Sequence, residues 1–170
     1  MQKEEAITGC LTAEQERLYR LAYSYVKNVE DALDAMQTAA CHALERQDSL
    51  RDKENPLPWL CRIVVNASLD ILRQRSRTEP LEAWQDPGKE DELPDDSLTR
   101  RIEALPPEIG TVIRLRYYEE LSLKEISTAT GANLSTVKTR LYTGLKRLRI
   151  MLEGEEALPY RRKERRHEGI

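Results

Sequence analysis

The stretch SLKEISTATGANLSTVKTRLYTGLKRLRIML, residues 122–152, combines the signals of two helices separated by a glycine turn. Ser122 and Glu125 have the spacing of a capping box, which begins a short helix. Gly131 suits the left-handed backbone conformation that follows such a helix, and Asn133 suits the N-cap position of the next helix. A short helix, a glycine turn and a longer helix together predict a helix-turn-helix.

The longer helix of this pair has an apolar side and a polar side. Because its apolar residues recur with a helical period, we expect a buried stripe of Val137, Leu141, Leu145, Leu148 and Leu152. On the other side, hydroxyl groups and a lysine near the N-terminal end can donate to base edges, and further cations suit phosphates. The candidate contacts to an upstream DNA element are Ser135, Thr136, Lys138, Thr139, Arg140, Tyr142 and Lys146.

The charge of this region favours nucleic acid as its partner. A helix with basic residues on its outer face is usually just a solvated helix, and any single cation proves little. Residues 126–152, however, contain no acidic side chain, although the whole chain has 30 acidic residues and a net charge of -3. An acid-free stretch where a recognition helix is expected therefore predicts DNA binding.

The rest of the composition predicts two small domains. A chain of 170 residues with 39% hydrophobic content can form one or two modest cores. Residues 79–99 carry eight acidic side chains and one basic side chain among prolines and a glycine, which is typical of an extended linker. We therefore expect domains at 1–77 and 97–153, an acidic linker at 78–96 and a basic tail at 154–170.

Helical periodicity also dominates the first domain. Thr12 and Gln15 have capping-box spacing before the first of three amphipathic segments. After the linker, Pro106 and Pro107 are suited to the first turn of another helix. No alternating strand pattern competes, so the sequence predicts an all-α fold of two small helical domains. The expected inward faces of the first domain are Leu18, Leu21, Ala22, Tyr25 and Val26, then Leu33, Met36, Ala40, Ala43 and Leu44, and then Leu60, Ile63, Val64, Ala67 and Ile71.

Other functional classes find little support in the sequence. Cys10, Cys41 and Cys61 are odd in number and lack a C-x-x-C spacing, so we interpret them as reduced thiols packed as small hydrophobic residues. His42 and His167 have no partners at catalytic spacing, and no phosphate-binding loop or metal-binding motif is present. We expect no cofactor, no metal, no enzymatic activity and no membrane span, and a cytoplasmic location.

At this point the sequence resembles the sigma factors of bacterial RNA polymerase, specifically the compact extracytoplasmic-function (ECF) type with two helical domains. The stretch LPPEIGTVIRLRYYEELSLKEISTATGANLSTVKTRLYTGLKRLR at 105–149 resembles the family's region 4, which reads the promoter element near minus 35. In the first domain, LYRLAYSYVKNVEDALDAMQ at 18–37 and WLCRIVVNASLDILRQR at 59–75 resemble region 2. The two matches occur in the family's order across the acidic linker.

The resemblance implies roles for residues of the first domain. Asp34 and Gln37 match the surface by which family members bind core RNA polymerase. Asn66 matches a position that lines a pocket for an unstacked base of the minus-10 element, and an amide can pair with the edge of such a base. The resemblance further implies minus-10 contacts at Leu50, Arg51, Arg62 and Arg73, places Arg75 near the same single-stranded DNA, and implies promoter melting and an anti-sigma factor as an additional partner.

One alternative from another class stays open at the level of the sequence. A helix-turn-helix regulator would bind duplex operators by itself, usually as a dimer on paired half-sites, and its N-terminal helices would sense a ligand or dimerise. The pattern WL-x-RI-x-x-N-x-x-x-D-x-x-R in residues 59–73 favours the sigma factor. Binding to core polymerase would distinguish the two.

Overall fold

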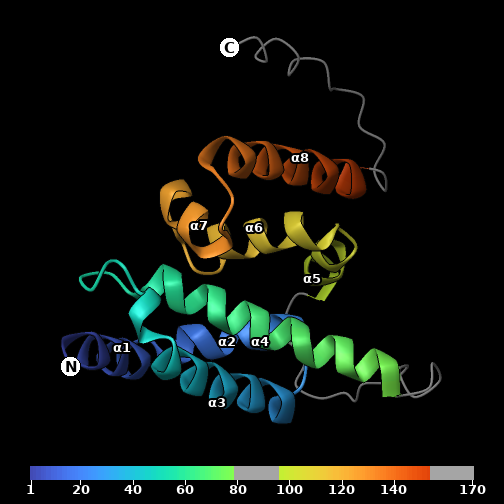
Figure 1. Ribbon diagram of the computed structural model, residues 1–170. Coiled ribbons are helices and arrows are strands. Elements are labelled where there is room, and N and C mark those ends of the chain that lie inside the picture. The colour runs from blue at the N-terminus through green and yellow to red at the C-terminus, as the bar shows by residue number, and fades with distance from the viewer. Residues whose placement is uncertain (79–95, 154–170) are drawn as a thin grey trace.

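The computed structural model describes residues 1–78 and 96–153, and this part of the chain is helical, without a strand (Figure 1). The predicted all-α fold with two small helical domains is confirmed. The expected linker at 78–96 and the tail at 154–170 lie almost entirely outside the described residues. The first domain contains α1 Gln2–Ala13, α2 Gln15–Val26, α3 Val29–Glu45, the 3-10 helix η1 Gln47–Ser49 and α4 Leu57–Thr78, and the second contains α5 Asp96–Glu103, α6 Pro107–Tyr117, α7 Leu123–Thr130 and α8 Leu134–Glu153.

The start of the first domain differs from the prediction. Residues 2–13 form helix α1, which the periodicity analysis did not predict, and Ile7 anchors this helix in the core. Thr12 therefore lies inside a helix, where its hydroxyl donates to the Thr8 carbonyl oxygen at 3.0 Å. The N-cap residue of α2 is Glu14, which makes no capping hydrogen bond with its side chain. The predicted capping box at Thr12 is wrong, because the preceding residues are already helical.

The buried face of α3 also differs from the prediction. An alanine stripe faces the core, and it consists of Ala32, Ala35, Ala39 and Ala43. Leu33 and Leu44, which were expected inside, are 53% and 37% exposed. Small side chains let α3 lie close to α2 and α4, and the larger apolar residues are displaced toward solvent. The predicted burial of Leu33 and Leu44 is therefore wrong, because hydrophobicity alone does not reveal how closely neighbouring helices pack.

Helix α4 is buried on two sides. The expected inward residues Leu60, Ile63, Val64 and Ala67 are buried, which confirms that face. Cys61 and Val65, on another side of the helix, are buried as well. Figure 1 shows the reason, since α4 lies between α2 and α3 on one side and α6 and α7 on the other. The two domains therefore share one continuous core in this arrangement.

Close packing of α6 on α8 completes the second domain. Helix α6 begins at Pro107, as predicted, and a Cβ atom at Gly144 of α8 would lie only 2.8 Å from Cγ2 of Ile109. The buried stripe of α8 is Val137, Leu141, Gly144 and Leu148, so that the apolar stripe is shorter than expected. Leu145 and Leu152 are 36% and 45% exposed, and their predicted burial is wrong because Gly144 occupies the contact with α6.

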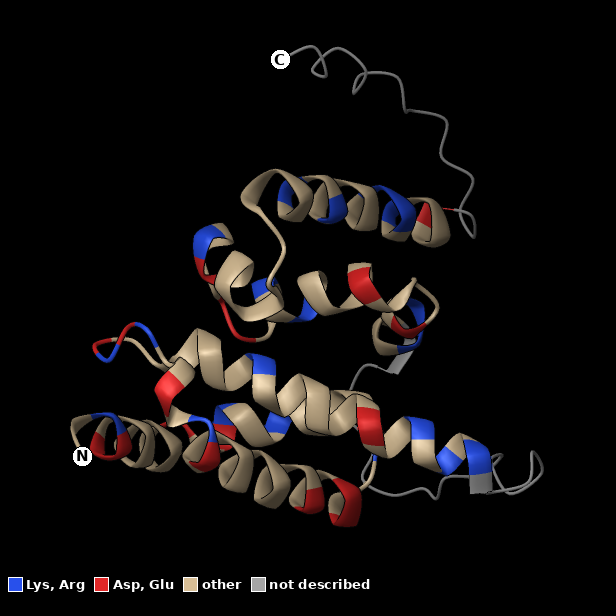
Figure 2. Ribbon diagram, viewed as in Figure 1, with Lys and Arg blue, Asp and Glu red and all other residues tan. Residues whose placement is uncertain are grey.

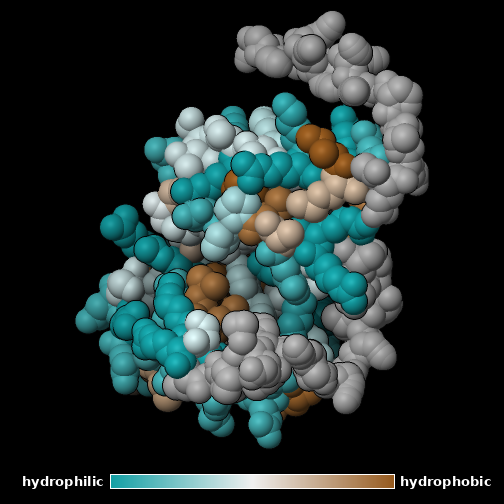
Figure 3. All heavy atoms as spheres, turned by 90° about the vertical axis from the view of Figure 1, so that its right-hand side faces the viewer, coloured by the Kyte–Doolittle hydropathy of each residue, from teal (hydrophilic) through white to brown (hydrophobic). Residues whose placement is uncertain are grey.

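The surface of the molecule is mostly hydrophilic on the face that Figure 3 shows. On this face, hydrophobic residues are exposed in separate areas among hydrophilic ones.

Cys61 is buried and Cys10 is partly buried, as expected for thiols that pack as small apolar groups. Burial raises the pKa of both thiols. Cys41 is exposed, so its predicted packing is wrong.

Candidate nucleic-acid interface

The helix-turn-helix is built as the sequence predicts. The Glu125 amide donates to the Ser122 hydroxyl at 3.0 Å, and the Ser122 amide donates to the Glu125 carboxylate at 2.9 Å, which confirms the capping box. Gly131 has a φ of 80°, in the left-handed region that favours glycine. The Thr136 amide donates to the Asn133 side chain at 2.9 Å and caps α8. Local hydrogen bonds thus fix the angle between α7 and α8.

The outer side of α8 is a continuous polar face. Ser135, Lys138, Thr139, Tyr142 and Lys146 are exposed and follow one another at spacings of three, one, three and four residues, so they share one side of the helix. Thr136 and Arg140 are only partly exposed, at the edges of this face. In Figure 2, α8 carries Lys and Arg along its length, with acidic colour only at its C-terminal end. We call the five exposed residues the α8 face.

A second set of candidate residues lies along α4. Arg62, Asn66 and Arg73 are exposed and are spaced by four and seven residues, which places them along one side of the helix. Arg73 is paired with Asp70 through Nη1 and Oδ1, 2.6 Å apart. The Arg62 guanidinium lies beside Gly131 of the helix-turn-helix, because a Cβ atom on Gly131 would be 3.1 Å from its Nη2. This side of α4 therefore approaches the second domain.

Two residues of the first domain are not available for such contacts in this arrangement. Leu50 is 1% exposed and packs in the core, so a direct contact with DNA would require it to leave the core. Arg75 donates to the Asp31 carboxylate and, at 3.2 Å, to the Val26 carbonyl oxygen. Arg75 thus holds the end of α4 against the α2–α3 junction. Arg51, next to Leu50, is exposed.

The candidate polymerase residues lie on the outer side of α3. Asp34 and Gln37 are exposed, on the side of α3 that the alanine stripe leaves free. Beside them lies an apolar surface that the sequence did not predict. It is a groove between the α1–α2 corner and α3, lined by Tyr19, Leu33 and Met36, together with Thr12, Ala13, Gln15 and Glu16. The signal was present, because small alanines on one side of α3 leave large apolar residues on the other.

The described residues do not suggest chemistry of another kind. Within residues 1–78 and 96–153, no cluster of His, Cys, Asp or Glu could hold a metal ion. None of the helices in these ranges is long and apolar enough to cross a membrane. In the capping box, the Ser122 amide lowers the pKa of the Glu125 carboxyl. That carboxylate therefore remains ionised and bound to its helix.

Family comparison matches both domains. The model for "Sigma-70 region 2" matches residues 10–78, and the model for "Sigma-70, region 4" matches residues 95–148. Among characterised relatives, the RNA polymerase sigma factor SigV of Bacillus subtilis is 39% identical over 154 residues, which cover 88% of this chain and 93% of SigV. The ECF RNA polymerase sigma factor SigW of the same organism is 29% identical over 168 residues, with 88% and 90% of the two chains covered.

Solved structures agree on the fold. The sigma factor RpoE in complex with the anti-sigma factor NepR, from Bartonella quintana, matches with a TM-score of 0.66 and 21% identity, covering 86% of this chain and 96% of RpoE. CnrH in complex with the cytosolic domain of CnrY matches with a TM-score of 0.65 and 18% identity, covering 91% and 96%. At these identities the comparison establishes the arrangement of helices.

Proposed function

This chain belongs to the ECF type of the sigma-70 family of RNA polymerase sigma factors, and from that membership we propose which of its surfaces bind promoter DNA and polymerase. As an ECF sigma factor it directs RNA polymerase to promoters for transcription initiation, and it is not an enzyme. The matching region 2 excludes the alternative of a regulator that has only a helix-turn-helix in common with the family.

The α8 face reads the duplex near minus 35. The observation that carries this assignment is the exposure of three hydroxyl groups and two lysines on one side of a helix that Ser122, Gly131 and Asn133 hold in helix-turn-helix geometry. Hydroxyl and ammonium groups donate to base edges in the major groove, which is wide enough to admit a helix. Lys146, two turns beyond Lys138, suits the phosphate backbone, as do Arg140 and Thr136 at the edges of the face.

The exposed side of α4 contacts the minus-10 element. Arg62 and Arg73 supply positive charge along the backbone of a melted strand, and Arg51 adds to it from the preceding loop. Asn66 lies between the two arginines on α4, and its amide can donate and accept at the edge of a base that has left the stack. Leu50 supports this surface from the core and is not itself a contact.

The outer side of α3 binds core RNA polymerase. Asp34 and Gln37 supply polar contacts, and the adjacent groove with Leu33, Met36 and Tyr19 supplies apolar area. A patch with an apolar centre and a polar rim is the usual anatomy of a protein interface. An anti-sigma factor is a further partner, because the sigma factor RpoE, which shares this fold, has been solved in complex with the anti-sigma factor NepR. A cytoplasmic location follows from the need to bind polymerase.

Permanganate footprinting of melted promoter thymines, with core polymerase present, tests the proposal. The wild-type chain should bind core polymerase and expose thymines across the minus-10 region. Asn66→Ala should retain polymerase binding and duplex binding while the melted signal decreases, because a base that is still stacked hides the edge that the amide would pair with.

The matched control is Ser76→Ala, which alters another exposed residue of α4. Its footprint should equal that of the wild-type chain. Equal thymine reactivity and equal promoter selectivity for Asn66→Ala and wild type would remove Asn66 from the minus-10 surface. A failure of Arg62→Ala and Arg73→Ala to weaken open complexes would remove the arginines in the same way.

A further inference from the structure

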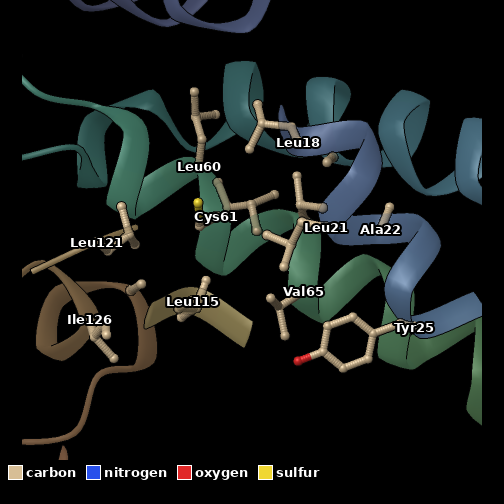
Figure 4. Close-up of a cluster of buried hydrophobic side chains, with 14 of the residues drawn as sticks. Leu18, Leu21, Ala22, Tyr25, Leu60, Cys61, Val65, Leu115, Leu121 and Ile126 are labelled. Atoms are coloured by element: carbon tan, nitrogen blue, oxygen red, sulfur yellow. The ribbon is translucent and has the colours of Figure 1, made fainter. Parts of the chain in front are cut away.

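The two domains are joined by a set of contacts that the promoter-binding surfaces do not use. Leu115, Leu121 and Ile126 of the second domain gather against Cys61 and Val65 of α4, and all five are buried (Figure 4). Removing such apolar side chains from water is favourable. The apolar contact therefore favours a closed arrangement of the domains.

Polar contacts surround this apolar patch. The Tyr25 hydroxyl of α2 is hydrogen-bonded to the Thr111 hydroxyl of α6, and the Arg114 guanidinium lies 4.1 Å from the centre of the Tyr25 ring. The amide of Asn55 donates to the Glu125 carboxylate at 2.9 Å. Lys27, at the C-cap of α2, is paired with Glu103 of α5. Each of these contacts joins one domain to the other.

Glu119 is a buried and poorly compensated carboxylate in this interface. Its side chain is 2% exposed, and its Oε1 lies 3.5 Å from the Arg17 Nε of α2. Oε1 nevertheless accepts no hydrogen bond from any residue that the structure describes. The Arg17 guanidinium also donates to the Glu119 carbonyl oxygen and pairs with Glu14 at 3.2 Å, so its charge is divided among three oxygens. A buried carboxylate with so little compensation is costly.

The surrounding charges do not offset the burial. The pKa of Glu119 is raised to about 7, mainly by burial; Arg17 and Arg20 lower it, and Glu14 and Glu120 add smaller increases. The thiol of Cys61 on α4 interacts electrostatically with this carboxylate and with the thiol of Cys10 on α1. None of these groups supplies a full counter-charge to Glu119.

Promoter binding requires the domains to separate. The minus-35 and minus-10 elements lie about 25 base pairs apart, or about 85 Å at 3.4 Å per base pair. A compact chain of this length has a radius of gyration of about 15 Å. The closed arrangement, in which Arg62 of α4 lies beside Gly131 of the helix-turn-helix, cannot place both domains on their elements. The closed arrangement is therefore a resting state.

We propose that Glu119 and Arg17 form a latch between the two domains, and that the charge on Glu119 determines how readily the closed arrangement opens. When Glu119 is neutral, its burial costs little and the domains remain together. When Glu119 is ionised, water in the open arrangement stabilises its charge better than Arg17 does in the closed arrangement. This proposal rests on the closed contacts themselves and does not depend on the DNA assignments above.

The direction of the pH dependence follows from linkage. In the closed arrangement Glu119 has a pKa of about 7, and in the open arrangement it returns toward the ordinary value of 4.5. The closed arrangement thus binds more protons between these values, so it is most stable below about pH 4.5 and loses stability as the pH rises to about 7. Between pH 5 and pH 8 the opening constant should rise by up to roughly 70-fold.

Labelling of Cys61 in the full-length chain measures this opening. Cys61 is fully buried, on the side of α4 that the second domain covers, and a Cys10→Ser, Cys41→Ser background leaves it as the single thiol. Dividing its labelling rate by that of an unfolded peptide of the same sequence, at each pH, gives the opening constant however small it is. We expect this constant to rise from pH 5 to pH 8 in the wild-type background.

Glu119→Gln and Glu120→Gln form a matched pair, because the second residue is the exposed neighbour of the first. Glu119→Gln should give an opening constant that stays constant with pH, whereas Glu120→Gln should follow the wild-type background. A wild-type constant without pH dependence, or an equal rise in both variants, overturns the latch. If Glu119→Gln does not fold, the carboxyl carbon NMR titration of the wild-type chain decides: a midpoint above 6 supports the latch and one near 4.5 overturns it.

Discussion

Gly144 shows how a single residue positions the DNA-reading helix. A Cβ atom added there would lie 2.8 Å from Cγ2 of Ile109 and 2.9 Å from Cδ1 of Ile113, so α8 could not approach α6 as closely. Overpacking typically costs about 1–3 kcal/mol, against a gain of up to about 1 kcal/mol in helix propensity. Gly144→Ala should therefore lower the free energy of unfolding in urea. Gly9→Ala is the control, because nothing lies within 4 Å of its Cβ position in α1, and it should increase that free energy.

A second prediction for a single residue concerns Lys138. It is exposed on the first turns of α8, where a base contact is expected, and Lys146 lies two turns further along the same side. Lys138→Ala should relax sequence preference at one or two upstream base pairs, at a cost of about 1–3 kcal/mol. Lys146→Ala should weaken all sequences alike. Binding-site selection with each variant measures both effects, and unchanged preferences for Lys138→Ala would remove it from the reading face.

At the scale of elements, α7 depends on its capping box. The Ser122 hydroxyl accepts from the Glu125 amide at 3.0 Å, and Ser122→Ala should destabilise the chain by about 1 kcal/mol. Because the pKa of the Glu125 carboxyl lies below its ordinary value of 4.5, its contribution is complete above that pH and is lost as the pH falls below it. Thermal unfolding at pH 7 should show this loss for Ser122→Ala, in which the residue 122 amide still donates to the Glu125 carboxylate. Ser76→Ala should change the melting temperature little, and a Ser122→Ala effect no larger than this control would contradict the prediction.

The same elements show how far sequence reasoning extends. Ser122, Gly131 and Asn133 act through their own backbone neighbours, so local spacing sufficed to predict the helix-turn-helix. The buried side of α3 and the second buried side of α4 depend on neighbouring helices, and hydrophobicity alone predicted them incompletely. Leu50 was a candidate contact by resemblance, yet its side chain packs in the core. Packing between distant segments has no signature in the periodicity of a single helix.

At the scale of the whole molecule, the closed arrangement itself is open to a direct chemical test. Lys27 and Glu103 belong to different domains, form an ion pair and are 31% and 40% exposed, so a zero-length carbodiimide reagent can reach and couple them. Mass spectrometry of the free chain should detect a Lys27–Glu103 isopeptide, and Glu103→Gln should abolish it. In the complex with core polymerase and promoter DNA the same coupling should nearly disappear, because the two elements hold the domains about 85 Å apart along the duplex. Equal coupling in the free and promoter-bound chains would mean that the domains stay closed on the promoter. That result would require the two promoter elements to be bound by different copies of the chain.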